Sequence, residues 1–155
     1  MRRRSGPRPK ITPQHSFVSI FGAISDILAV EPTRMTTDYK IHLEVRNAHQ
    51  ERFDIDEIVA SVSDPWWNQT LTSVNDSVVR LGIVEGEFHW HKHDNDDEFF
   101  YVVSGKLYID LEDQTIELGP NQGVTISKGV MHRPRAPQKT VMLMVESNQI
   151  VPTGD

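Results

Sequence analysis

The chain has 155 residues, an apolar fraction of 37%, no cysteine and a formal net charge of -6. This length and apolar fraction provide for one modest hydrophobic core, so we expect a single folded domain without a second catalytic domain. Without cysteine the chain forms neither disulfides nor thiolate metal sites. Its acidic net charge argues against nucleic-acid binding. No apolar run is long enough to suggest a membrane-spanning helix.

The first 35 residues differ in composition from the rest of the chain. Residues 1–15 contain basic residues and prolines but no acidic residue, which predicts disorder. Apolar side chains at helical spacing over residues 17–30 predict an amphipathic helix, although Gly22 and Asp26 interrupt the run. A targeting segment has a similar pattern, but Asp26 lies inside the apolar part and no small-residue cleavage site follows Leu28. We interpret residues 1–35 as an extension that adds nothing to the fold, and we expect a cytoplasmic protein.

Residues 36–150 have the pattern of one domain built mainly of strands. The one clear helix signal is Asp54, an N-cap residue followed three residues later by Glu57, which predicts a short helix over 58–62 that ends before Asp64-Pro65. Turn residues then separate short apolar runs at regular spacing. The predicted strands are 77–84, 87–93, 98–103, 106–112, 115–118, 123–127 and 140–146. This pattern predicts an all-β jelly-roll barrel.

Three histidines alternate along the predicted strand 87–93. Because successive side chains of a strand project to opposite faces, we expect His89, His91 and His93 on one face. A polar turn then leads into the predicted strand that begins at Glu98, and antiparallel pairing would place this carboxylate beside His91 and His93. Imidazole and carboxylate ligands suit a borderline or hard divalent ion. His132, after a glycine turn, is one further isolated histidine.

The order and spacing of these residues resemble the two motifs of the cupin superfamily, over about residues 78–146. The matching residues are His91, His93, Glu98 and Gly105 in the first motif and Gly129 and His132 in the second. The resemblance, to small single-domain bacterial cupins, implies a double-stranded β-helix. It also implies one divalent metal ion, Fe, Mn, Zn or Ni, held by His91, His93, Glu98 and His132.

The second motif departs from the family pattern at three positions. Ser127 replaces a proline, Asn121 replaces the leading glycine, and Ala136 stands where the family has a closing asparagine. These positions belong to turns rather than to the implied ligands, so they bear on loop geometry more than on the metal.

Other candidate residues have two interpretations each. In one interpretation His89 is a catalytic group that moves a proton near the ion; in the other it is a core histidine that forms a hydrogen bond with a neighbouring strand. Arg133 and Arg135 are interpreted either as residues that bind an anionic substrate at the barrel mouth or as solvated charges. The tryptophans are more typical of packing or dimer contacts than of substrate platforms; they are Trp66, Trp67 and Trp90.

An ion with three histidine ligands and one carboxylate ligand keeps open positions, which is typical of catalytic metals. We therefore expect a small metalloenzyme that acts on an oxygen-bearing organic molecule. The resemblance implies an isomerase, cyclase or dioxygenase, as in mannose-6-phosphate isomerase-like and polyketide cyclase-like stand-alone cupins. The alternative is a non-catalytic module that binds a small molecule or senses metal. Exposed strand edges in so small a barrel predict a homodimer.

Overall fold

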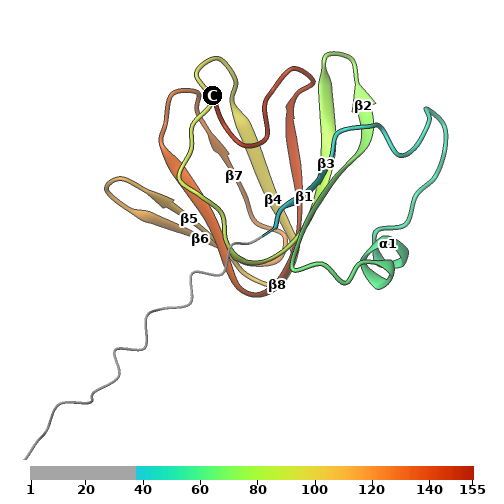
Figure 1. The fold of residues 1–155 in the computed structure, drawn as a ribbon, viewed down its shortest axis with the longest axis horizontal. Coiled ribbons are helices and arrows are strands. Elements are labelled where there is room, and N and C mark those ends of the chain that lie inside the picture. The colour runs from blue at the N-terminus through green and yellow to red at the C-terminus, as the bar shows by residue number, and fades with distance from the viewer. Residues whose placement is uncertain (1–37) are drawn as a thin grey trace, which may run out of the picture. The chain divides into compact units, whose positions relative to one another are not determined.

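The computed structural model of the protein describes residues 38–155, and within this range it contains eight strands and one short helix (Figure 1). The helix is α1 (Ile55–Ser61). The strands are β1 (Lys40–His42), β2 (Trp66–Val74), β3 (Ser77–Glu87), β4 (Glu98–Ser104), β5 (Leu107–Leu111), β6 (Thr115–Leu118), β7 (Gly123–Ile126) and β8 (His132–Ser147). The predicted extension and its helix over residues 17–30 lie outside the described residues. In the part of the chain that is described, no helix has the length and apolar character needed to span a bilayer.

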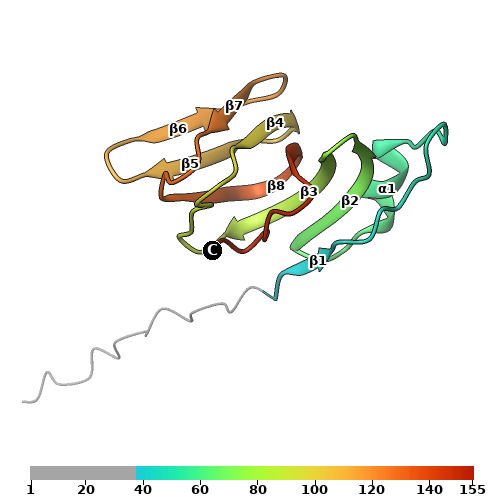
Figure 2. The same cartoon turned by 90° about the horizontal axis from the view of Figure 1, so that it is seen from above.

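Strand β8 connects the two parts of the barrel. Its C-terminal half lies between β3 and β4, in the order β1-β2-β3-β8-β4-β7. Its N-terminal residues 132–135 pair with β5, which pairs with β6, while Arg135 and Ala136 still pair with β3. Figure 2 shows strands β4 to β7 on one side of β8 and strands β1 to β3 on the other. The predicted all-β architecture is confirmed.

Helix α1 directly follows its N-cap residue, Asp54. The Asp54 side chain accepts hydrogen bonds from the backbone N–H groups of Asp56 at 3.0 Å and Glu57 at 3.4 Å. The helix therefore starts three residues before the predicted range. It lies beside β2 (Figure 2) and buries Ile58 in an apolar cluster with Trp67 and other side chains from the outer faces of β2, β3 and β8.

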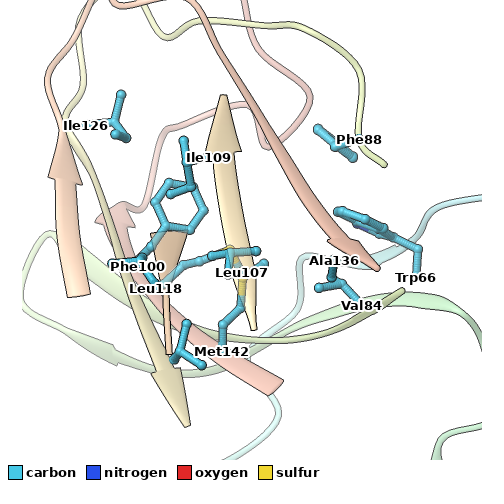
Figure 3. Close-up of a cluster of buried hydrophobic side chains, with 12 residues drawn as sticks. Trp66, Val84, Phe88, Phe100, Leu107, Ile109, Leu118, Ile126, Ala136 and Met142 are labelled. Atoms are coloured by element: carbon cyan, nitrogen blue, oxygen red, sulfur yellow. The ribbon is translucent and has the colours of Figure 1, made fainter. Parts of the chain in front are cut away.

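The alternation of side chains along the strands separates this outer cluster from the core inside the barrel. Trp66 packs in the interior cluster and the adjacent Trp67 packs in the outer one, because successive strand residues point to opposite faces. Figure 3 shows Phe100, Leu107 and Met142 of the interior cluster close to one another. Trp66 and Trp67 are buried in these two apolar clusters, whereas Trp90 is 44% exposed.

The short strand β1, the whole of β2 and the first half of β8 escaped prediction. Strand β2 contains the buried polar residues Asn68, Gln69 and Thr70. Its sequence therefore lacks the alternation of apolar and polar residues by which a strand is recognised. Strand β8 begins at His132 instead of residue 140. Its first half contains Pro134 and Pro137, and prolines argue against a strand in sequence-based reasoning.

Candidate metal centre

Three separate parts of the chain bring four side chains together at one end of the barrel. Glu98 begins β4, His132 begins β8, and His91 and His93 lie in the segment between β3 and β4. The backbones of His91 and His132 form a two-hydrogen-bond bridge, with N···O distances of 3.0 and 2.9 Å. One ligand atom from each of the four residues lies within 4.8 Å of all the others. All four side chains are buried, as expected of a site that faces the barrel interior.

The predicted strand over 87–93 is wrong beyond its first residue. Strand β3 ends at Glu87, after an irregularity in its pairing with β8 between Val84 and Gly86. Gly86 has a φ of +106°, a conformation that favours glycine. Beyond this point a continuous ladder no longer enforces alternation, and Phe88 is buried while His89 is exposed. His91 and His93 share the interior as expected.

His89 does not point into the barrel with the other histidines. Its exposed ring lies against the end of the described chain, where Nε2–H donates to the carbonyl of Thr153 at 2.8 Å. Its backbone carbonyl accepts a hydrogen bond from Nδ1–H of His91 at 3.1 Å. The structure thus places the backbone of His89, rather than its imidazole, in contact with a candidate ligand. A catalytic role for the His89 side chain stays a prediction.

Backbone carbonyls orient two of the three buried imidazoles. Nδ1–H of His91 donates to His89, and Nδ1–H of His132 donates to the carbonyl of Val130 at 3.0 Å. Such bonds fix the ring and its tautomer, and they leave the Nε2 lone pair for a metal ion. Nε2 of His132 lies 3.2 Å from Oε2 of Glu98, in the centre of the group.

His93 tests whether these residues suit a metal. Its side chain is only 2% exposed, yet neither ring nitrogen has a hydrogen-bond partner. Nε2 lies 3.5 Å from Oε2 of Glu98, too far for a good hydrogen bond. Leaving a polar group buried and unpaired costs free energy, which coordination of a metal ion would offset. The donors present therefore fit one divalent cation bound by three imidazoles and one carboxylate.

The electrostatic environment keeps two of these groups in the protonation state that metal binding requires. Burial, reinforced by the neighbouring His132, lowers the pKa of His91 to about 4, so this imidazole is neutral at pH 7. Burial alone would raise the pKa of Glu98. The close approach of the His132 and His93 imidazoles outweighs it and lowers the pKa of Glu98 to about 2, which keeps the carboxylate ionised.

A pocket adjoins the four residues, and His91 and Glu98 form part of its wall. Most of the other lining is apolar and includes Trp66, Phe88 and Met142. Asn68 also lines the pocket, and its Oδ1 is buried without a hydrogen-bond partner. Apolar walls with a few converging polar groups are typical of binding sites for small organic molecules.

Sequence reasoning missed a buried ion pair in the barrel interior. Arg80 of β3 pairs with Glu146 of β8, and their side chains are 4% and 1% exposed. Burial, and then the nearby negative charge of Glu98, raise the pKa of Glu146 to about 8. The signal was an arginine in the middle of the apolar run Val78–Val84, because a charge at an inward position of a strand requires a buried partner.

Arg133 and Arg135, which the sequence left open as an anion-binding pair or as solvated charges, have acidic partners. Arg133 forms ion pairs with Glu87 at 2.9 Å and with Asp110 at 2.8 Å, and Arg135 also pairs with Asp110 at 2.8 Å. The guanidinium of Arg135 lies over the ring of Tyr108. These contacts favour a structural role for both arginines.

Comparison with known proteins agrees with the geometry. A family profile for the cupin domain matches residues 78–147. The chain is 41% identical over 93 residues to the uncharacterized protein YdbB of Bacillus subtilis. This match covers 59% of this chain and 82% of YdbB.

Solved structures give the same result. A cupin-2 domain containing protein from Shewanella frigidimarina is similar with a TM-score of 0.59 and 33% identity, over 61% of this chain and 93% of that chain. A protein from Neisseria meningitidis has a TM-score of 0.57 at 20% identity, over 63% and 99% of the two chains, and supports the fold alone. The predicted double-stranded β-helix is thereby confirmed, and the chain belongs to the cupin domain family.

Proposed function

We propose that this protein holds one divalent metal ion and uses it to act on a small oxygen-bearing organic molecule. The observation that carries the proposal is His93, a buried imidazole without a hydrogen-bond partner that converges with three other potential ligands. An ion bound by three histidines and one carboxylate keeps open positions, and such an ion polarises an oxygen atom of a bound compound.

The chain's own residues supply binding and orientation. The carbonyls of His89 and Val130 hold the imidazoles of His91 and His132 so that their Nε2 atoms face the same point. Trp66 and Met142 offer an apolar surface to the body of the organic molecule and exclude water from it. These features support a ligand with a metal-binding oxygen at one end and an apolar body.

A non-catalytic binding module is the second candidate. Among the described residues that line the pocket, His91 and Glu98 are the only ones with titratable side chains, and both belong to the candidate metal centre. A separate general acid or base is therefore not provided by the pocket wall. This arrangement suits chemistry that requires only polarisation by the metal, and it equally suits binding without turnover.

The first experiment measures the metal content of protein purified without chelator and without an affinity tag that binds metal. We expect close to one divalent ion per chain in the wild type, and we expect His132→Ala and Glu98→Gln to lose it. His49→Ala is the matched control, because His49 is an exposed histidine bonded to Ser73 and is not one of the four candidate ligands. A wild-type protein that retains no Fe, Mn, Zn or Ni, even after reconstitution, would refute the proposal.

A second measurement separates the two candidate functions. Hydroxy acids, sugars and oxygenated ring compounds are screened for thermal stabilisation of the metal-loaded protein, and each stabilising compound is recovered and analysed. A compound recovered in changed form supports the enzyme, with iron favouring dioxygenase chemistry and zinc, nickel or manganese favouring isomerase or cyclase chemistry. Stabilising compounds that are all recovered unchanged support the binding module.

A further inference from the structure

Residues 152–155, here called the 152–155 segment, pack against the segment that carries two of the four candidate ligands. Three hydrogen bonds join the two segments: Nε2–H of His89 donates to the carbonyl of Thr153 at 2.8 Å, the N–H of Asp155 donates to the carbonyl of Lys92 at 3.1 Å, and the N–H of Asp94 donates to Oδ2 of Asp155 at 2.7 Å. These bonds attach to the chain on both sides of His91.

Gly154 brings the 152–155 segment into direct contact with the side chain of His91. A Cβ atom at Gly154 would lie 2.7 Å from Cβ of His91 and 3.0 Å from the carbonyl oxygen of Lys92. Gly154 also has a φ of +89°, which disfavours other residues. The close approach therefore requires glycine, and the atoms that it approaches belong to a candidate ligand and its neighbour.

The 152–155 segment also forms part of the pocket wall. Pro152 lines the same pocket as His91 and Glu98. The cupin family profile ends at residue 147, so this contribution lies outside the part of the chain that the profile covers. The pocket beside the candidate metal centre is thus built in part from a residue beyond the matched domain.

The segment around His91 needs such support. Strand β3 ends at Glu87 and β4 begins at Glu98, and between them the bridge to His132 is the one β-type pairing within the described residues. An imidazole on a segment with so little strand pairing can turn away from the other ligands unless further contacts hold it. Contacts that orient a ligand typically change metal affinity by about 10- to 100-fold.

We propose that the 152–155 segment is a positioning element of the metal centre and that Gly154 is its positioning residue, acting through His91. The inference rests on the proposed function, because it assumes that His91 is a metal ligand. The segment holds the backbone on both sides of His91 and limits the space available to its side chain. Metal affinity therefore depends on residues that bind no metal themselves.

The test compares Gly154→Ala with Gly86→Ala. Both glycines have positive φ, so both variants carry the backbone cost of a side chain in that region. A Cβ at Gly86 meets no atom within 4 Å, whereas a Cβ at Gly154 meets His91. In a chelator competition with Zn²⁺, we expect Gly154→Ala to bind about tenfold more weakly than wild type and Gly86→Ala to stay within about twofold.

Hydrogen exchange of the metal-free proteins provides a second readout. Amides of residues 91–94 should exchange faster in Gly154→Ala than in wild type and should be unchanged in Gly86→Ala. Asp155→Ala removes only the acceptor for Asp94 and leaves the chain otherwise intact, so it should show a smaller loss of Zn²⁺ affinity. Asp155→Asn, which keeps an acceptor oxygen, should restore the affinity.

The outcomes separate this inference from the proposed function. If the wild type binds Zn²⁺ and Gly154→Ala binds it equally well, or if both glycine variants lose affinity equally, the inference fails while the proposed function stands. If the wild type binds no divalent ion, both fail.

Discussion

Replacing Arg80 with methionine should destabilise the metal-free protein by about 1 to 3 kcal/mol. The guanidinium of Arg80 and the carboxylate of Glu146 form an ion pair whose side chains are 4% and 1% exposed. In Arg80→Met, the buried Glu146 loses its partner. Burial and the nearby charge of Glu98 already raise the pKa of Glu146 to about 8, and the loss of Arg80 raises it further, so the side chain is protonated at pH 7. The cost therefore arises from a buried polar group left without its partner, since methionine itself is suited to an apolar interior.

The double variant Arg80→Met/Glu146→Leu tests this reasoning. With both charges removed, the unfolding free energy should return to within about 1 kcal/mol of wild type, because apolar replacement of a buried ion pair is often neutral or stabilising. Urea denaturation followed by tryptophan fluorescence measures all four corners of the double-mutant cycle. Arg52→Met is the control, since the Arg52 side chain is 84% exposed, and it should change stability by less than about 0.5 kcal/mol. A double variant as unstable as Arg80→Met would refute the argument.

Four further measurements test other parts of the structure. Zn²⁺ at 100 times its dissociation constant should raise the unfolding free energy by about 2.7 kcal/mol, and an unchanged urea midpoint would contradict binding to the folded state. Hydrogen bonds from Arg135 and then Arg133 hold the pKa of Asp110 well below its usual range. As the pH falls below about 4, Asp110 takes up a proton in the unfolded chain before it does so in the folded protein, and this shifts the equilibrium towards unfolding. Asp110→Asn should reduce stability at pH 7 and flatten that loss in pH-dependent urea titrations. Leu107→Ala, at a position with 0% exposure, should cost about 2 to 5 kcal/mol in urea denaturation. Light scattering should give the mass of a homodimer, and a monomer of 17.7 kDa would contradict that prediction.

The sequence by itself determined features that depend on neighbouring residues or on a fixed order of motifs. Asp54 predicted that a helix follows it, because an N-cap acts on backbone N–H groups two and three residues away, although the predicted range began three residues after the start of α1. The spacing of His91, His93, Glu98 and His132 predicted the four side chains that the structure brings together. Alternation along a strand also explains why β4 runs from Glu98 with buried residues at every second position at its start.

Only the tertiary structure decided which of the alternating histidines face the barrel interior. The ladder between β3 and β8 is irregular between Val84 and Gly86 and ends at Glu87, before His89, and period-two reasoning fails where no partner strand enforces it. The pairing of Arg80 with Glu146 and the contact of Gly154 with His91 join residues more than sixty positions apart. Such contacts depend on how the barrel closes, and no local pattern of residue types contains that information.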